Sequence, residues 1–346
     1  MNSRIRNFLK RALLRTSPTF AKVQRLENAL KDQKTFIREQ DRTIDLLFKY
    51  IIDINYGMDL NIDNLDDYIS ISRRYHERFG TYPDLYNPRK FSEKIQWRKL
   101  FDRKAIYTLC ADKYRVREYV SERIGKEYLI PLLQVCESPE QINYSTLPDS
   151  FVIKTNHASR TNILVEDSSI IDKDEIAEQL ESWLKINFYK ELPEGMANQG
   201  REWQYRDITP LIMIEEMLKD NEVSTPNDYK FHCFRNNSDT EVLIQIDLDR
   251  FTNPKRIIYD ESWNRLPFTF AFEQSEIDVG KPMALGKMID IAKSLSVAFD
   301  YVRVDLYLVM GRVFFGELTF TPGNGFSKFV PPEFDRIMGD KWQLAK

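Results

Sequence analysis

The first 55 residues repeat apolar positions at helical spacing. From Ile5 to Leu13, apolar side chains recur at i, i+3, i+4, i+7 and i+8, and basic residues surround them. The pattern predicts a basic amphipathic helix over residues 1–16. Such a helix suits the surface of an anionic membrane, and equally suits packing on the protein itself or on a partner. The sequence leaves both interpretations open.

A longer helical pattern follows Pro18. Between Val23 and Ile51, nine positions step by three and four residues alternately, and all are apolar except Gln33 and Gln40. The spacing predicts a helix over residues 19–55 with about four heptads, which favours a coiled coil. A coiled coil would make a homo-oligomer through residues 23–51. One amphipathic helix docked on its own domain explains the same pattern, so oligomerisation stays an alternative.

Beyond residue 60 the periodicity switches repeatedly between helical and strand spacing. Periods of 3.6 predict helices, whereas short β-branched and aromatic runs next to turn residues predict strands. Mixed elements of this kind, with an antiparallel pair at the end, predict an α+β architecture. The expected helices cover residues 65–79, 92–100, 113–124, 174–188 and 283–299, and the expected strands cover residues 151–154, 212–215, 231–234 and 242–247.

Two further strands, 302–309 and 313–318, form a predicted hairpin around Gly311. Arg303 and Asp305 share one face of the first strand, and Glu317 shares a face with Thr319 on the second. If the turn pairs the strands, the two carboxylates come close together and repel one another unless a cation lies between them. Magnesium prefers such oxygen ligands, and an adjacent arginine can stabilise a developing oxyanion. A structural ion pair explains the same residues.

Composition narrows the classes of function. The net charge of −3 argues against nucleic-acid binding. Three distant cysteines and three histidines predict neither a disulfide framework nor a histidine-rich metal site. Charges interrupt the N-terminal apolar positions, and no run of 18 apolar residues occurs, so we expect a cytoplasmic protein. The predicted helix over residues 1–16 would then contact the inner face of the membrane peripherally.

Several motifs resemble those of the ATP-grasp superfamily, and within it the teichuronopeptide-biosynthesis (TupA-like) branch. They occur in one order between residues 85 and 340 and leave out the N-terminal helices. The resemblance implies two α+β subdomains that clasp a nucleotide, in a domain covering residues 111–340 behind a helical part at 60–110. The motifs are NPRKFSEKIQW at 87–97, ADKY at 111–114, GKEYLIPLL at 125–133, FVIKTNHASR at 151–160, REWQYRDITPLIMIEEML at 201–218, DYKFHCF at 228–234, DRFTNPKR at 249–256 and YVRVDLY…FFGELTFTPGNG at 301–325.

The resemblance also implies cofactors and residue roles. ATP and Mg²⁺ are the implied cofactors, with Asp305, Glu317 and Thr319 as metal ligands and Arg303 beside the tetrahedral intermediate. Thr319 departs from the asparagine that many ATP-grasp enzymes carry at this place. The remaining implied nucleotide contacts are Lys113 and Lys154 as the two nucleotide lysines, His157, Ser159 and Arg160 in the phosphate loop, Glu215 and Leu218 in the adenine hinge, Glu222 near the ribose, and Lys230 facing the phosphates.

One segment departs from the branch. Its phosphate loop usually reads His-Gly-Ser-Gly, whereas this chain has Ala158 and Arg160 in place of the glycines. Glycine allows a positive φ and a close approach of the backbone to phosphate, and we expect these two residues to lose that freedom. Either Arg160 supplies charge to the phosphates instead, or ATP binding and turnover are weakened. We favour retained binding, because the metal acids and both lysines are present.

The implied activity is that of a carboxylate–amine ligase, which forms an amide through an acyl-phosphate. For this branch the expected substrates are a glycan or sugar-linked carboxylate and an amino acid or other amine, joined on a cell-surface polysaccharide such as a capsule or on its precursor. Two alternatives remain: a glycosyltransferase of polysaccharide synthesis, for which Asp247-Leu248-Asp249 is the nearest metal motif, and an ATP-binding scaffold that has lost turnover.

Overall fold

The computed structural model describes residues 28–29, 31–33, 65–189, 201–219, 227–248 and 253–344. The chain divides into two compact units, residues 1–72 and residues 73–346. Most of the predicted N-terminal helices, 1–16 and 19–55, lie outside the described residues. The two short described stretches within them are helical. The coiled coil and the membrane contact therefore stay predictions.

All five helices expected beyond residue 60 are present, so this part of the prediction is confirmed. Three have clearly different limits: α6 begins three residues later than expected, α7 ends four residues earlier, and α8 begins two residues later and ends three residues earlier. Two short helices, α5 and α9, were not predicted. The helices are α3 (Leu65–Phe79), α4 (Phe91–Phe101), α5 (Ala105–Ala111), α6 (Val116–Ile124), α7 (Lys173–Leu184), α8 (Leu285–Ser296) and α9 (Glu333–Asp340). Short 3₁₀ turns include η5 (Trp203–Tyr205) and η6 (Pro322–Gly325).

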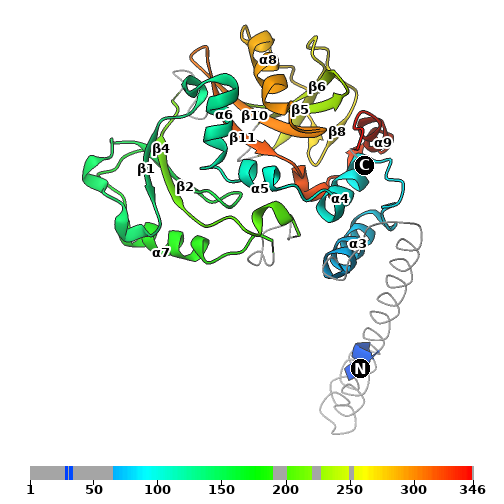
Figure 1. The fold of residues 1–346 in the computed structure, drawn as a ribbon, viewed down its shortest axis with the longest axis horizontal. Coiled ribbons are helices and arrows are strands. Elements are labelled where there is room, and N and C mark those ends of the chain that lie inside the picture. Colours follow the sequence, from blue (N-terminus) through cyan, green and yellow to red (C-terminus); the bar gives the residue numbers. More distant parts are fainter. Residues whose placement is uncertain are drawn as a thin grey trace, which may run out of the picture. The chain divides into compact units, whose positions relative to one another are not determined.

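The strands form two main sheets (Figure 1). The smaller sheet has the order β1-β4-β2-β3 with every pair antiparallel. The larger sheet has the order β11-β10-β5-β6-β7-β9, antiparallel except for the last pair. This mixture confirms the α+β prediction. The strands are β1 (Leu132–Cys136), β2 (Phe151–Thr155), β3 (Asn162–Val165), β4 (Ile212–Glu216), β5 (Asn227–Asn236), β6 (Asp239–Leu248), β7 (Lys255–Tyr259), β9 (Glu273–Gln274), β10 (Tyr301–Val309) and β11 (Arg312–Thr319), with β8 (Thr269–Phe270) and β12 (Phe329–Val330) as a separate pair.

The two faces of the six-stranded sheet bury different side chains, because successive residues of a strand point to opposite faces. On one face, Val302, Val304 and Leu306 of β10 pack in the main core with apolar residues of α5, α6 and α8. The intervening residues of β10 point the other way, where Tyr301 joins a second core with residues of α4 and α9. Further along that second face the side chains become charged, which prepares the site described below.

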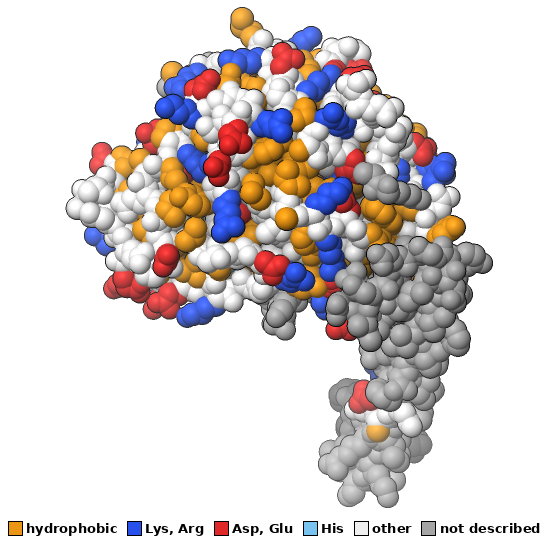
Figure 2. Space-filling view, in the orientation of Figure 1, with side chains coloured by type: hydrophobic (Ala, Val, Ile, Leu, Met, Phe, Trp, Pro, Cys, Tyr) orange, Lys and Arg blue, Asp and Glu red, His pale blue; other side chains and the backbone are white. Residues whose placement is uncertain are grey.

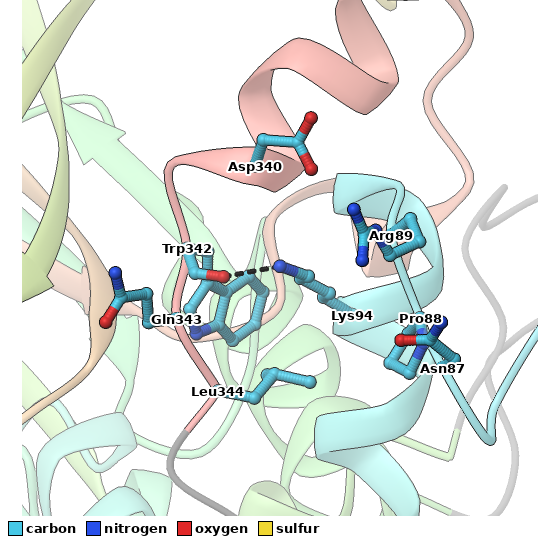
Figure 3. A pocket seen from close by; sticks show the side chains of 8 residues that line it. All are labelled: Asn87, Pro88, Arg89, Lys94, Asp340, Trp342, Gln343 and Leu344. Atoms are coloured by element: carbon cyan, nitrogen blue, oxygen red, sulfur yellow. Dashed lines mark hydrogen bonds between the residues drawn. The ribbon is translucent and has the colours of Figure 1, made fainter.

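Helix α4 is fixed to the end of α9 by a buried lysine. Lys94 donates from Nζ to the carbonyl oxygens of Gly339, at 2.8 Å, and Trp342, at 2.5 Å. Lys94 and Trp342 border a cavity of about 290 Å³ (Figure 3). Burial lowers the pKa of Lys94 from its ordinary value. The carbonyls at a helix C-terminus carry partial negative charge, which favours the ammonium there.

Charged side chains of both signs are interspersed on the face shown in Figure 2, and neither sign forms a continuous patch over the described residues. This distribution agrees with the small net charge of the chain. None of the helices in the described ranges is both long enough and apolar enough to cross a membrane.

Candidate functional site

A cavity of about 430 Å³ is lined by residues of both main sheets. One side consists of β5, β10 and β11, and we call it the hairpin wall. The other consists of β2, β4 and the loop at residues 156–161, and we call it the loop wall. Both walls carry charged side chains into the cavity, among them Arg303, Asp305 and Lys230 from the hairpin wall and Lys154 and Arg160 from the loop wall.

The hairpin pairs as the sequence predicts. Asp305 is the register partner of Glu317, and Arg303 is the partner of Thr319. A bulge follows, because the register shifts between Asp305 and Leu306. Gly316 makes this bulge feasible, since a Cβ at that position would lie 3.0 Å from the backbone oxygen of Asp305. The predicted proximity of the two acids is confirmed.

Arg303 lies between the two acids and contacts both. Its Nε and Nη2 donate to Asp305 Oδ1 and Oδ2, each at 2.7 Å. Nη2 also donates to Glu317 Oε1 and Thr319 Oγ1, each at 2.9 Å. Although burial alone would lower the pKa of Arg303, the charges of Asp305 and Glu317 raise it. The guanidinium is therefore firmly charged and shared among three oxygen-bearing side chains.

Lys230 adds a second cation to the hairpin wall. It faces Asp305 across the β5–β10 pair and donates to Asp305 Oδ2 at 2.8 Å. It also forms a short ion pair with Asp228, two residues earlier on β5. Burial opposes the charge of Asp305, but Arg303 and Lys230 outweigh it and lower the pKa of this carboxyl. The sequence prediction included Lys230 but missed Asp228, whose i, i+2 spacing from Lys230 was the available signal.

Glu215 organises the charges of the loop wall. Its Oε2 pairs with Lys154 Nζ at 2.5 Å, and its Oε1 accepts from Arg117 Nη1 at 3.0 Å. The side chain of Glu215 is only 4% exposed, whereas the side chain of Lys154 is 18% exposed and reaches the cavity. Glu215 was predicted to hold adenine in the hinge. In the structure this carboxylate is the anchor of Lys154, a role that needs the β2–β4 pairing.

Lys113 is tied to the phosphate loop. It lies in the turn between α5 and α6, and its Nζ donates to the carbonyl oxygen of Ala158. Its backbone N–H donates to the oxygen of Asn156 at 3.1 Å. Burial lowers the pKa of Lys113, with Lys154 contributing in the same direction. The two predicted nucleotide lysines, Lys113 and Lys154, are 41 positions apart in the sequence. Separate elements of the fold bring them to one cavity.

The expectation that Arg160 loses the conformational freedom of glycine is wrong for its backbone. Arg160 has a φ of 63°, in the left-handed region that glycine favours. A residue with a Cβ occupies this region at a cost of roughly 1–2 kcal/mol. The loop thus keeps the glycine-like conformation at this position, and both Arg160 and Ser159 line the cavity. Ala158 also lines the cavity, although it is almost fully buried.

The remaining predicted contacts have different locations. His157 is 2% exposed and is not among the residues that line the cavity. Its ring packs edge-on against that of Phe188, with 5.5 Å between the ring centroids. Burial and the charge of Lys113 lower its pKa, which favours a neutral ring. Leu218 lines the cavity beside a small apolar cluster, whereas Glu222 lies outside the described residues. The nucleotide-binding role of each stays a prediction.

A half-buried acid next to the hairpin wall escaped the sequence prediction. Glu202, one residue before η5, accepts a short hydrogen bond from Thr321, two residues beyond Thr319. Burial raises the pKa of Glu202, and Glu317 contributes in the same direction. The pKa of Tyr205 in η5 is also raised. Burial is the main cause, and the charges of Glu202 and Glu317 contribute in the same direction. No motif singled out Glu202, because only tertiary packing brings residues 202 and 321 together.

The donor set fits a divalent cation held together with phosphates. Asp305, Glu317 and Thr319 supply hard oxygen atoms on one side, and Lys113, Lys154 and Arg160 supply positive charge on the other. Magnesium is bound in this way, by one or two carboxylates plus phosphate oxygens. The described residues contain no group of three or more His, Cys, Asp or Glu side chains arranged for a metal.

Comparison with known proteins gives a family and several distant structures. The model of the TupA-like ATPgrasp family matches residues 93–343. Among solved structures, D-alanine–D-alanine ligase from Helicobacter pylori is 14% identical with a TM-score of 0.35, over 63% of this chain and 56% of that chain. Phosphoribosylamine–glycine ligase from Thermotoga maritima is 13% identical with a TM-score of 0.36, over 61% of this chain and 48% of that chain.

A third structure is a Chryseobacterium gregarium RiPP-associated ATP-grasp ligase in complex with ADP and a leader and core peptide. It is 10% identical with a TM-score of 0.33, over 72% of this chain and 66% of that chain. The chain spans little more than half the length of the first D-alanine–D-alanine ligases that it matches. No curated protein matches it.

Proposed function

Since the chain belongs to the TupA-like ATP-grasp family, we propose that it is an ATP- and Mg²⁺-dependent ligase that joins a carboxylate to an amine. The observation that carries this proposal is the pair of Asp305 and Glu317 facing Lys113 and Lys154 across one cavity. Acids for a metal and cations for phosphates are what the transfer of a phosphoryl group to a carboxylate requires.

In the proposed reaction, the carboxylate substrate attacks the γ-phosphorus of ATP, ADP leaves, and an acyl-phosphate is formed. The amine then adds to the acyl carbon and loses a proton, and inorganic phosphate leaves as the amide forms. Lys113, Lys154 and Arg160 hold the phosphates in line. Asp305, Glu317 and Thr319 would hold Mg²⁺, which neutralises charge on the phosphoryl group when it is bound. Arg303 has the charge and the position to stabilise the tetrahedral oxyanion that precedes the amide.

The substrate class that we propose is a glycan or sugar-linked carboxylate, with an amino acid or a related amine as its partner. Membership in the TupA-like family supports this class, because this branch is associated with teichuronopeptide biosynthesis. The activity would modify a cell-surface polysaccharide or its precursor in the cytoplasm. Contact with the inner membrane surface through residues 1–16, and oligomerisation through residues 23–51, belong to the same proposal. Deletion of residues 1–55 tests the second point: an unchanged molar mass by light scattering would remove it.

The transferase alternative has weaker support. Asp247 is the described half of its Asp-Leu-Asp motif, and Arg256 donates to both of its carboxylate oxygens, at 2.6 and 3.0 Å. Gln245 donates to the same carboxylate from the neighbouring position on that strand face. A carboxylate saturated in this way lies in a strand rather than in a metal-binding loop. No comparable observation favours a scaffold without turnover.

Nucleotide preference and a double substitution test the proposed ligase. Mg²⁺ with ATP should raise the melting temperature, whereas UDP-sugars should not; the opposite pattern would favour a transferase. The acceptor is sought by measuring ADP release with amino acids against uronic acids. In the variant Asp305→Asn with Glu317→Gln, ADP release should fall by about a thousandfold, because the metal ligands are lost. Undiminished turnover in the folded variant would refute the assignment of the metal site.

A further inference from the structure

We infer that Arg303 and Mg²⁺ compete for the same acids, so that the metal binds only after nucleotide phosphates have drawn Arg303 away. This inference rests on the proposed function, because that proposal assigns Asp305, Glu317 and Thr319 to the metal. The structure supplies the competitor itself, since the guanidinium of Arg303 contacts all three side chains at once. Arg303 is thereby a residue that sets the order of binding.

Four of the five side-chain oxygens of the assigned metal ligands already take part in hydrogen bonds, Glu317 Oε2 being the exception. Both oxygens of Asp305 accept from Arg303, and Oδ2 accepts from Lys230 in addition. Glu317 Oε1 accepts from Arg303 and from Thr319 Oγ1, the latter at 2.8 Å. Magnesium binds oxygen at about 2.0–2.1 Å and requires nearly octahedral geometry. Asp305 Oδ2 and Glu317 Oε1 each accept two hydrogen bonds, so neither has a lone pair left for the ion while Arg303 stays in place.

Charge reinforces the steric conflict. Arg303 and Lys230 already offset much of the negative charge of Asp228, Asp305 and Glu317. The side chains of Asp305 and Arg303 are 5% and 13% exposed, so water screens their interaction with a further cation only weakly. A divalent ion entering beside two retained cations would meet strong repulsion. Metal binding therefore requires either the departure of Arg303 or added negative charge.

Nucleotide phosphates can bring about both changes, the departure of Arg303 and the addition of negative charge. A phosphate accepts the planar fork of a guanidinium in the two-bond geometry that a carboxylate offers, so Arg303 can exchange one partner for the other. Phosphates also bring the negative charge that lets a divalent ion enter the cluster. Lys154 and Arg160 on the facing loop wall, together with Lys113 from the turn between α5 and α6, attract the nucleotide without needing the metal. The expected order is nucleotide first, metal second.

The substitution Arg303→Gln tests this order through two binding measurements that should move in opposite directions. Without nucleotide, the affinity for Mn²⁺, measured by electron paramagnetic resonance as a probe for Mg²⁺, should rise by about tenfold when the competing charge is removed. Without metal, the affinity for AMP-PNP, measured by calorimetry in EDTA, should fall by about tenfold as one phosphate contact is lost. Damage to the structure alone would weaken both.

Two further variants secure the test. Arg336→Gln removes an arginine that pairs with Asp340 at 3.0 Å on α9, outside the cavity, and should change neither affinity. If Arg303→Gln fails to fold, Arg303→Lys takes its place, because lysine keeps the charge but cannot contact both acids as a fork. It should raise Mn²⁺ affinity by a smaller factor. Mn²⁺ affinity in the folded Arg303 variant that is equal to or weaker than that of the wild type would overturn the inference.

Failure of the inference is distinguishable from failure of the proposed function. If the wild-type protein binds neither AMP-PNP nor ATP under any metal condition, the proposed ligase activity fails. If the wild type binds nucleotide and turns over ATP, but Mn²⁺ affinity does not rise in the Arg303 variants, only the competition between Arg303 and the metal fails.

Discussion

The hairpin wall and the loop wall of the cavity both carry cations and acids, but they distribute them differently. On the hairpin wall, Arg303 and Lys230 pair directly with Asp305, so charges of both signs satisfy each other within the wall. On the loop wall, the acid Glu215 also lines the cavity, but its side chain is only 4% exposed and is shared between Lys154 and Arg117. The side chain of Lys154, at 18% exposed, is therefore more accessible than the acid that it pairs with. The loop wall is prepared for phosphate, whereas the hairpin wall must exchange partners.

Burial should make the hairpin wall the more sensitive of the two in stability. Lys230→Met leaves Asp228 and Asp305 buried with one cation fewer, and we expect a loss of about 3 kcal/mol in the free energy of unfolding. Urea unfolding measures this loss. Adding Asp228→Asn should recover part of it, because the unpaired carboxylate is then neutral. A smaller loss in Lys230→Met than in the loop-wall variant Lys154→Met would reverse the comparison.

The loop wall should instead be sensitive in nucleotide binding. Lys154→Met leaves Glu215 with Arg117 as its partner, so the free energy of unfolding should fall by no more than about 1 kcal/mol. Affinity for ATP should fall by about tenfold, because a point charge facing the phosphates is lost. Calorimetry gives the affinity. Lys185→Met, in an exposed pair with Glu181 on α7, is the matched control and should alter neither quantity.

Arg160 tests whether the loop wall depends on backbone or on charge. Arg160→Gly should leave stability nearly unchanged, since relief of the left-handed strain, about 1 kcal/mol, is offset by the entropy of glycine in the unfolded chain. ATP affinity should fall by about fivefold through the lost charge. Arg160→Asn also tolerates this backbone but lacks the charge, so equal affinity in wild type and Arg160→Asn would show that charge is unimportant there.

The smallest expected effect concerns pH and the acid beside the hairpin wall. Burial first, and then Glu317, raises the pKa of Glu202 above its ordinary value of 4.5. The stability that its protonated form contributes is complete below that ordinary value and is lost as pH rises through the folded pKa. The free energy of unfolding of Glu202→Gln should therefore not show this fall as pH rises. Urea unfolding of both proteins between pH 4 and about 8 measures the difference, and parallel pH profiles would contradict the assignment.

Asp305 should show the opposite pH dependence within the same neighbourhood. Its pKa is lowered by Arg303 and Lys230 in spite of burial. Its contribution to stability is present above the ordinary value of 3.8 and is lost as pH falls through the folded pKa. The pKa values of two carboxyls near one hairpin are therefore shifted in opposite directions. Burial raises the pKa of Glu202 in spite of the hydrogen bond from Thr321, whereas Arg303 and Lys230 lower the pKa of Asp305 in spite of burial.

The sequence by itself determined the elements and the local part of the hairpin. Periodicity located every helix expected beyond residue 60 and the strands β2, β4, β5, β6, β10 and β11. It did not predict β1, β3, β7, β8, β9 and β12, none of which is longer than five residues. Alternation around the Gly311 turn was enough to place Asp305 opposite Glu317, because a hairpin fixes its register through its own turn.

Only the tertiary structure decided what those residues contact. Lys230 meets Asp305 through pairing of β5 with β10, and Glu215 meets Lys154 through pairing of β4 with β2, partners that no local pattern specifies. The positive φ of Arg160 is likewise imposed by the surrounding loop against the preference of the residue. Periodicity reports which side of a strand a residue faces, whereas ion pairs between distant strands depend on sheet order. For that reason the two acids and the arginine beside them were visible in the sequence, whereas the ion pairs of Lys230 with Asp305 and of Lys154 with Glu215 were not.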